Sequence, residues 1–262
     1  MTKVRLNISA TLFSHKFRHP ANTTNLLEQI RFFHHRRLDN HQRIEQTSIT
    51  NIIILLSCLF DEFNMIWYEE EIKHLEREGK NLKYRPEMAF YGSSTIRLWK
   101  TLYEDFQPYK PVNLGFGGST LAACVWFFDR VFASYHPTSI IIYAGDNDLG
   151  DGRHPEEVFI YFQQLAARIQ HHYGDIPCYF ISIKPSFTRW NIIESLKYTN
   201  YLIENEISKM NNNWKFINIF NKMIDKNGYP KKEYLDQDDL HLNDEGFELW
   251  KQIILSKISS HH

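Results

Sequence analysis

The sequence predicts an α/β fold in which a parallel sheet is covered by helices on both faces. From residue 65 onwards, short apolar segments alternate with longer segments whose apolar residues recur at helical spacing. One apolar segment, residues 139–144, is continuous, which is typical of a strand buried on both faces. No repeat or low-complexity linker interrupts this alternation after residue 65. Strands that alternate with helices in this way specify a parallel sheet.

Five apolar segments are expected to form the strands. The first ends at Gly92, and the second closes in a glycine-rich turn at residues 115–118. The third is the continuous segment named above, and the last two are rich in β-branched and aromatic residues. The expected strands are residues 88–92, 111–118, 139–144, 176–183 and 214–219.

Six segments with helical periodicity lie around these strands. The first is amphipathic, ends near Gly79 and places Glu69 four residues before Lys73. Start signals are Ser119 for the third helix, Pro155 for the fourth and Asn243 for the last. The expected helices are residues 65–79, 94–106, 120–132, 155–169, 193–210 and 243–258.

Residues 1–64 differ in composition from residues 65–262 and are expected to be an N-terminal extension of the domain. Their apolar run, residues 52–60, is too short to span a bilayer, which needs about 20 residues. A secretory signal would place its apolar core nearer the start. We therefore expect no membrane span and a cytoplasmic location, with a secreted or anchored form as the alternative. A further alternative is that Met65 is the biological start and that the extension is not part of the native protein.

Charge and cysteine content argue against several classes of partner. The 30 basic and 31 acidic residues give a net charge of -1, so electrostatics provides no reason to expect nucleic acid or an anionic membrane. Three widely spaced cysteines, Cys58, Cys124 and Cys178, indicate neither a disulfide framework nor a zinc site. The side chains of adjacent histidines diverge on regular elements, and the pair His15 and His19 lacks a third ligand. The glycine-rich turn lacks the spacing of a nucleotide or phosphate loop. No metal and no cofactor are expected.

Four short segments at the carboxyl ends of predicted strands, or in loops beyond them, contain the parts of an acyl-transfer site. They are Gly-Ser-Ser at 92–94, Gly-Phe-Gly-Gly at 115–118, Gly-Asp-Asn-Asp at 145–148 and Asp-Asp-Leu-His at 238–241. Acyl transfer needs a nucleophile, a base, a group that orients the base, and donors for an oxyanion. Ser94, His241 and Asp238 can fill the first three roles. The Gly118 N–H and the Asn147 side chain can donate to the oxyanion.

Each of these residues also has a simpler interpretation. Ser94 can be a helix N-cap, and Ser93 is a competing hydroxyl one residue earlier. Asn147 can be an ordinary turn residue. The candidates for orienting His241 are Asp238, Asp236 and Asp239, and only the three-residue spacing favours Asp238. Asp146 and Asp148 are expected to be solvated or turn-forming.

The order and spacing of the four segments resemble the SGNH, or GDSL-type, hydrolase family over residues 91–246. Gly-Ser-Ser-Thr-Ile-Arg-Leu-Trp at 92–99 is similar to the subgroup with Gly-Ser-Ser in place of Gly-Asp-Ser. The resemblance implies a three-layer α/β/α sandwich with a flavodoxin-like, five-stranded parallel sheet. It implies Ser94 as nucleophile and Asp238 with His241 as the rest of a triad. The oxyanion hole would comprise the Ser94 N–H, the Gly118 N–H and the Asn147 side chain.

Two residues depart from the family pattern. Ser93 stands where the family name expects Asp, and Ser119 stands where many members have Asp. Neither is the nucleophile or the base, so we expect the chemistry to be retained and the surrounding hydrogen bonds to differ.

The expected activity is that of a cofactor-independent serine esterase acting through an acyl-enzyme on a small-molecule ester. No long apolar lid insertion is evident in the sequence. Short acyl groups, as in acetylated carbohydrates or small lipid-like esters, are therefore favoured over long-chain triglycerides. Acyl transfer to an alcohol is the alternative within the same chemistry. A catalytically silent module that binds carbohydrate or another small ligand is the alternative outside it.

Overall fold

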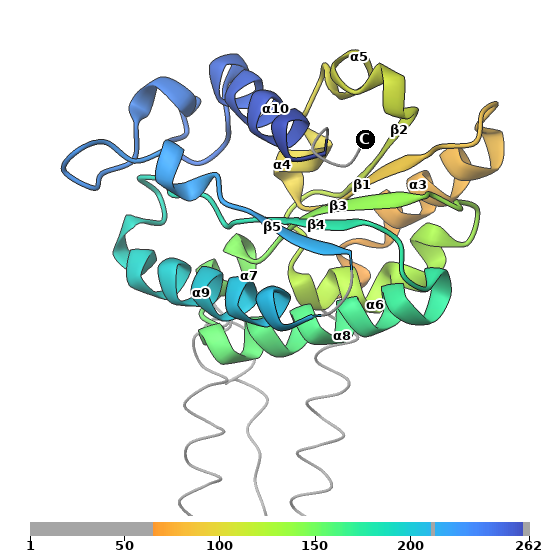
Figure 1. Cartoon of the computed structure of the whole chain (residues 1–262), viewed down its shortest axis with the longest axis horizontal. Coiled ribbons are helices and arrows are strands. Elements are labelled where there is room, and N and C mark those ends of the chain that lie inside the picture. Colours follow the sequence, from red (N-terminus) through yellow and green to blue (C-terminus); the bar gives the residue numbers. More distant parts are fainter. Residues whose placement is uncertain (1–64, 211–212, 259–262) are drawn as a thin grey trace, which may run out of the picture. The chain divides into compact units, whose positions relative to one another are not determined.

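The computed structural model describes residues 65–210 and 213–258, and the fold is built around a sheet of parallel strands (Figure 1). Its strand order is β2-β1-β3-β4-β5, and every neighbouring pair is parallel. This order is the flavodoxin-like one, so the predicted fold class is confirmed. The strands are β1 (Met88–Gly92), β2 (Pro111–Gly115), β3 (Ser139–Tyr143), β4 (Cys178–Ile181) and β5 (Trp214–Ile217).

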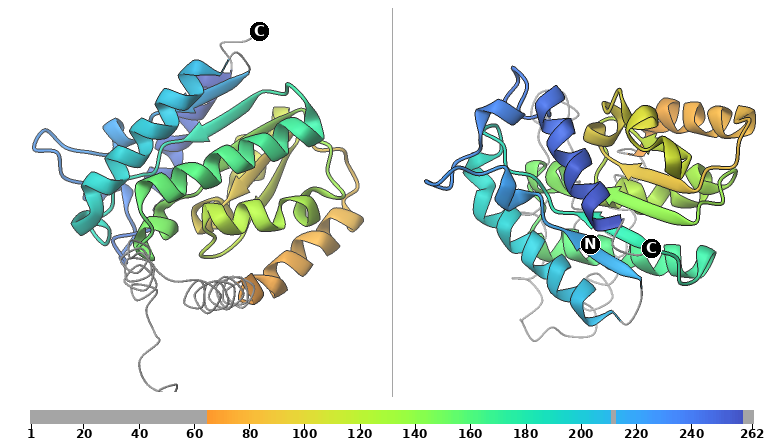
Figure 2. Two further views of the ribbon diagram at one scale, coloured as in Figure 1. Left: turned by 90° about the horizontal axis from the view of Figure 1, so that it is seen from below. Right: turned by 45° about the horizontal axis from the view of Figure 1, so that its top comes forward.

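Helices cover both faces of the sheet because successive strand residues point to opposite sides. In β1, Ala89 and Tyr91 pack into one core, whereas Met88 and Phe90 pack into the other. The first core lies under α3 (Glu69–Asn81), α6 (Leu121–Phe132), α8 (Pro155–Tyr173) and α9 (Ile193–Lys209). The second lies under α4 (Ser94–Arg97), α5 (Leu102–Asp105) and α10 (Asp244–Ile258) (Figure 2).

Short elements complete the connections. The helix α7 (Asp146–Gly150) follows β3 directly. The 3-10 helices are η2 (Gln107–Tyr109), η3 (Trp190–Ile192), η4 (Phe220–Lys222) and η5 (Lys232–Tyr234).

The single helix predicted from residue 94 to residue 106 is wrong. The chain instead forms α4 and α5, separated by four residues. The Trp99 indole donates to the Asp105 carboxylate at 2.8 Å, and the Thr101 hydroxyl donates to the same oxygen at 2.6 Å. Trp99 is also buried in the second core. These side-chain bonds compete with a continuous helical ladder and favour the break.

Several helix ends differ from the sequence prediction. The α3 helix runs past Gly79 to Asn81, and its Glu69 bonds Arg130, not Lys73. The N-cap of α6 is Thr120, whose hydroxyl accepts from the Ala123 N–H at 3.0 Å, so the prediction of Ser119 is wrong. Asn243 does open α10 as predicted, because its side-chain oxygen accepts from the Gly246 N–H at 2.9 Å.

The strand order places a switch point at the carboxyl end of β1. Here β1 has β2 on one side and β3 on the other, and Gly92 is in register with both Gly115 and Tyr143. Ligands of open α/β sheets bind in the crevice outside the carboxyl ends of the strands at such a point. Three of the four sequence segments singled out above follow β1, β2 and β3.

Within residues 65–210 and 213–258, no helix has the length and apolar character needed to cross a membrane. The proposed extension 1–64 and its apolar run 52–60 lie outside the described residues.

Candidate active site

The chain leaves β1 through a glycine that no other residue could replace without strain. Gly92 has φ +140°, and a Cβ at this position would lie 1.9 Å from the Tyr143 carbonyl oxygen. The next residue, Ser93, donates its N–H to the same carbonyl at 2.9 Å. The close pairing of β1 with β3 therefore fixes where α4 begins.

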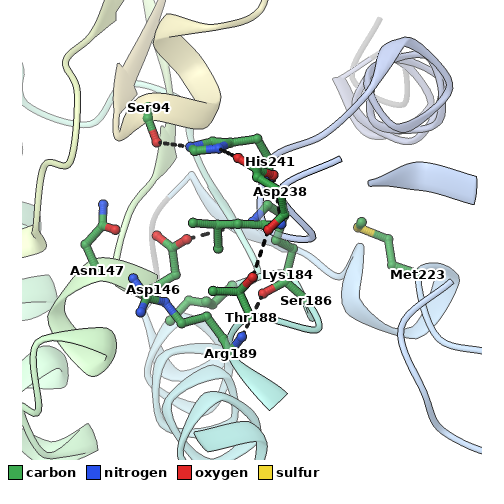
Figure 3. Close-up of polar contacts among 12 residues, drawn as sticks. Ser94, Asp146, Asn147, Lys184, Ser186, Thr188, Arg189, Met223, Asp238 and His241 are labelled. Atoms are coloured by element: carbon green, nitrogen blue, oxygen red, sulfur yellow. Dashed lines mark hydrogen bonds and ion pairs between the residues drawn. The ribbon is translucent and has the colours of Figure 1, made fainter. Parts of the chain in front are cut away.

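The first helical residue of α4 is Ser94, and the N-cap is Ser93. The interpretation of Ser94 as the N-cap is therefore wrong. Ser93 is fully buried, and its Oγ has no hydrogen-bond partner among the described residues. Ser94 is partly exposed, and its Oγ lies 3.0 Å from His241 Nε2 (Figure 3).

The Asp238 carboxylate fixes His241 from within the same loop. Asp238 Oδ2 lies 2.5 Å from His241 Nδ1, and Oδ1 accepts from the backbone N–H groups of Leu240 and His241 at 3.0 and 2.9 Å. An antiparallel bridge between Leu235 and Leu242 closes the loop at its base. The ring is thus held with Nε2 directed at Ser94.

Neither rival aspartate bonds the imidazole ring. Asp236 meets His241 only through its own backbone N–H, which donates to the His241 carbonyl at 2.8 Å. The Asp239 carboxylate bonds Lys232 instead. Among the three aspartates, Asp238 is the one whose carboxylate reaches the ring.

The Asp238 carboxyl is held in its ionised form. Partial burial alone would raise its pKa, but the hydrogen bonds from the His241 ring and from two backbone N–H groups lower it to about 2. The carboxylate is therefore negative over the whole physiological pH range. It favours the His241 tautomer with the proton on Nδ1, which leaves Nε2 as an acceptor for the Ser94 hydroxyl proton.

Residues 116–119, called the glycine turn below, follow β2 and bring the second segment to this edge. The Ser119 N–H donates to the Phe116 carbonyl at 3.4 Å, and Gly118 has φ +66°. A Cβ at Gly118 would meet nothing within 4 Å, so glycine is needed here for its backbone conformation and not for space. None of the described residues accepts a hydrogen bond from the Gly118 N–H.

Asn147 joins the third segment to the glycine turn. Its Nδ2 donates one hydrogen to the Ser119 carbonyl at 3.1 Å. An amide nitrogen carries two hydrogens, so the second can donate to another acceptor. Asn147 lies near the start of α7, immediately beyond β3. Asn147, which follows β3, is therefore bonded to the glycine turn, which follows β2 on the other side of β1.

Comparison with known proteins identifies the family. Residues 88–249, more than half of the chain, match the GDSL-like Lipase/Acylhydrolase family. The chain belongs to this family. Among curated proteins, none matches the sequence.

Several solved structures share the GDSL-type fold. A protein of Streptococcus pneumonia whose description names platelet activating factor is 20% identical, with a TM-score of 0.66 over 78% of this chain and 98% of the other. A GDSL-like lipase of Bacteroides thetaiotaomicron is 20% identical, with a TM-score of 0.62 over 73% and 98%. A family 3 carbohydrate esterase of Clostridium thermocellum is 15% identical, with a TM-score of 0.52 over 66% and 94%. At these identities the likeness concerns the fold.

Two acidic residues of this GDSL-type domain, Asp146 and Asp148, are buried in the helix α7, so the expectation that they are solvated or turn-forming is wrong. Asp148 is fully buried, and its carboxylate accepts from the Leu121 N–H at 2.7 Å and lies 3.2 Å from Arg153. Burial raises the Asp148 pKa to about 6 against the opposing charge of Arg153. Asp146 is buried 3.8 Å from the Lys184 ammonium. Burial lowers the Lys184 pKa, and Asp146 opposes this shift. Both aspartates flank Asn147 in α7, and their bonds connect this short helix to the start of α6 and to the segment after β4.

One contact that supports the histidine loop has no signal in the sequence. The Thr188 hydroxyl donates to the Asp238 carbonyl at 2.9 Å, and the Thr188 N–H donates to the Asp239 carbonyl at 3.3 Å (Figure 3). Thr188 lies in the loop after β4, fifty residues before Asp238. The GDSL-type domain thus holds its C-terminal histidine loop from the neighbouring strand connection.

Proposed function

We propose that the protein is a serine esterase that hydrolyses carboxylic esters through an acyl-enzyme on Ser94. The observation that carries this proposal is the chain of hydrogen bonds from Ser94 Oγ through the His241 ring to the Asp238 carboxylate. It lies beyond the carboxyl ends of the strands in a member of an acylhydrolase family. A nucleophile, a base and an orienting acid in this order are the parts that acyl transfer requires.

In the acylation step, His241 Nε2 takes the proton of the Ser94 hydroxyl while Oγ attacks the ester carbonyl carbon. The 3.0 Å separation of Oγ and Nε2 suits this proton transfer. Asp238 stabilises the imidazolium that forms. The carbonyl oxygen becomes negative and is stabilised by the N–H groups of Ser94 and Gly118 and by Asn147 Nδ2.

The remaining steps return the site to its starting state. The imidazolium gives its proton to the leaving alcohol as the carbon–oxygen bond of the ester breaks, which leaves the acyl group on Ser94. His241 then takes a proton from water, and the resulting hydroxide attacks the acyl carbon. The proton returns to Ser94 Oγ as the acid is released.

We further propose that the substrates carry short acyl groups, such as acetyl esters of carbohydrates or small lipid-like esters. Two features support this preference. The elements that border Ser94 and Asn147 are short, since α4 and α7 have four and five residues. A carbohydrate esterase is among the proteins that share the fold.

Turnover of p-nitrophenyl acetate by the wild type and by Ser94→Ala tests the esterase proposal. We expect the substitution to reduce kcat to the background rate, because no other partly exposed hydroxyl of the described residues bonds the His241 ring. Equal rates for both proteins would contradict the proposal and favour a silent binding module. Adding glycerol as a competing acceptor separates the two acyl-transfer reactions, since a transferase forms acetylglycerol in preference to acetate.

A panel of p-nitrophenyl esters with two to twelve acyl carbons tests the chain-length proposal. We expect kcat/KM to be highest for acetate and to fall with each lengthening of the acyl group. A maximum at eight or more carbons would contradict it.

A further inference from the structure

The peptide that carries the proposed oxyanion donor is the central peptide of a β-turn. In the glycine turn, the hydrogen bond from Ser119 to Phe116 closes residues 116–119, and Gly118 at the third position has positive φ. Positive φ at this position alone is the signature of a type II turn. The N–H of Gly118 belongs to the peptide between Gly117 and Gly118. The hydrogen bond that closes the turn leaves the orientation of this central peptide free.

Contacts from α3 and from its N-cap residue, Tyr68, hold the peptides on both sides of the central peptide. On one side, the Gly117 N–H donates to Glu71 Oε2 at 2.6 Å. On the other side, the Gly118 carbonyl accepts from the Tyr68 hydroxyl at 3.1 Å. The peptide between Gly117 and Gly118 is thus flanked by two fixed neighbours while its own N–H stays unpaired among the described residues.

The Glu71 carboxylate also faces the nucleophile helix. Arg97, the last residue of α4, lies with its Nε 3.7 Å from Glu71 Oε2. The two side chains are 47% and 43% exposed, so this ion pair contributes little to stability. The ion pair matters for position, because Glu71 contacts both the helix that begins with Ser94 and the turn that contains Gly118.

The Tyr68 hydroxyl stays protonated and can therefore act as a permanent hydrogen-bond donor. Burial, with Asp151 and Asp148 nearby, raises its pKa to about 12, so its hydroxyl keeps its proton at any working pH. Its ring packs edge-to-face against Phe116 and Phe127, with centroids 5.5 and 6.2 Å apart. The ring is therefore fixed by packing on the turn itself and on α6.

The helix α3, which carries Glu71 and has Tyr68 as its N-cap, is itself held by ion pairs and by packing. Arg130 of α6 makes a bidentate pair with Glu69 at 2.8 and 3.0 Å and bonds Glu76 at 2.8 Å. Next to these glutamates on α3, Ile72 and Leu75 are buried in the first core. A rigid α3 can therefore set the position of the turn.

From these contacts we propose that Glu71 and Tyr68 are positioning residues that hold the Gly118 N–H in the orientation that receives the oxyanion. The inference rests on the proposed esterase function. Both residues precede residues 88–249, the span that matches the family, so the match does not contain them.

The test compares kcat and KM for p-nitrophenyl acetate in Glu71→Ala, Glu71→Gln and Tyr68→Phe. Complete loss of an oxyanion donor costs about 10²–10³ in kcat, and a donor that is only loosened is expected to cost about tenfold for Glu71→Ala and for Tyr68→Phe. KM should change less than about twofold, because the donor acts on the transition state. Glu71→Gln keeps an oxygen that can accept from Gly117 and should recover most of the loss.

The matched control is Glu70→Ala, whose exposed side chain lies on the same turn of α3 and bonds only Lys73 among the described residues. Inhibition by a trifluoromethyl ketone provides a second measurement, because its adduct with serine carries an oxyanion. Its affinity should fall in parallel with kcat. Tyr68→Phe retains the packed ring, so this variant is expected to fold with an unchanged melting temperature.

Two results would overturn the inference. One is kcat in both Glu71→Ala and Tyr68→Phe within about twofold of Glu70→Ala, a range too small for a loosened donor. The other is a loss of kcat with no change in affinity for the trifluoromethyl ketone. A failure of the proposed function is distinguishable, because wild type and Ser94→Ala would then turn over the ester at the same rate.

Discussion

The carboxylate of Asp238 binds His241 twice, through the ring and through the backbone. Oδ2 lies 2.5 Å from Nδ1, and Oδ1 accepts the His241 backbone N–H at 2.9 Å. The three-residue spacing allows one side chain to make both contacts within a single loop. The orientation of the ring relative to its loop is therefore set within the loop, while the Thr188 contact holds the loop itself.

The activity should decrease on the acid side of its pH profile. Asp238 has a pKa of about 2, so it stays ionised down to acid conditions in which an imidazole is already protonated. We expect kcat/KM to fall as the pH decreases from 8 to 5, because a protonated imidazole cannot take the Ser94 proton. A flat profile over this range would argue against His241 as the base.

Unfolding should not account for that loss of activity. The folded-state pKa of Asp238 lies below its ordinary value, so its contribution to stability is present above about pH 4 and is lost as the pH falls through about 2. The side chain is half exposed, which makes this contribution small. Circular dichroism at pH 5 and pH 8 checks that the fold is retained.

Asp238→Asn should lower kcat by about 10²–10⁴ at neutral pH, because the amide can select the wrong tautomer of the ring.

Ser93→Ala should keep activity and leave stability unchanged or raised by about 1 kcal/mol. The Ser93 hydroxyl is fully buried without a partner among the described residues, and removing such a group relieves a desolvation cost. Turnover of p-nitrophenyl acetate and the thermal unfolding midpoint measure both effects. Loss of activity in this variant alone would move the nucleophile from Ser94 to Ser93.

Gly118→Ala should reduce activity in a folded protein, whereas Gly92→Ala should prevent folding. At Gly118 a Cβ meets no atom within 4 Å. The cost of Gly118→Ala is therefore only that of placing alanine in the left-handed backbone conformation, about 1–2 kcal/mol. We expect a folded protein with reduced kcat, because relief of the strain reorients the Gly118 N–H. At Gly92 the same change places Cβ 1.9 Å from the Tyr143 carbonyl and should prevent stable folding. Expression yield and circular dichroism distinguish the two outcomes, and a well-folded Gly92→Ala would contradict the register of β1 and β3.

Asn147→Ala should lower kcat by about 10²–10³ with little change in KM, as expected for loss of one oxyanion donor. The substitution also frees the Ser119 carbonyl, so part of the loss reflects movement of the glycine turn. The exposed Asn227 provides a matched control, and Asn227→Ala should behave as the wild type. A kcat for Asn147→Ala equal to that of the control would exclude this side chain from the oxyanion site.

Thr188→Val should reduce kcat a few-fold without changing KM. The isosteric change removes the hydroxyl that donates to the Asp238 carbonyl, a bond of about 0.5–1.5 kcal/mol. Thr188→Ser keeps the hydroxyl and should restore kcat. If both variants had the same rate, the contact would have no part in holding the histidine loop.

The parts of the site that could be predicted from sequence are those whose geometry is local or set by strand order. Asp238 and His241 share one loop, and Ser94 follows an apolar strand that a parallel sheet places at a known edge. The helix between Ser94 and Phe106 was predicted incorrectly because helical periodicity does not reveal the bonds from Trp99 and Thr101 to Asp105.

The burial of Asp146 and Asp148 depends on partners far away in the chain. Asp148 meets the Leu121 N–H 27 residues earlier, and Asp146 pairs with Lys184 38 residues later. In sequence, Gly-Asp-Asn-Asp has the composition of an exposed turn. The sequence alone does not show which carboxylates are buried, because their partners are brought close only by folding. The same is true of Glu71, whose partner Gly117 lies 46 residues away.

The position of Tyr68 and Glu71 in the chain bears on where the functional unit begins. Both lie after Met65, so a polypeptide translated from Met65 retains the two contacts to the glycine turn. A polypeptide trimmed to Met88, the first residue of the family match, lacks both and also exposes the Phe116 and Phe127 faces that Tyr68 covers. A polypeptide with the boundaries of the family match would therefore contain Ser94, Asp238 and His241 but would lack both contacts to the glycine turn. The contacts that we propose to position the Gly118 N–H thus begin about twenty residues upstream of the family match.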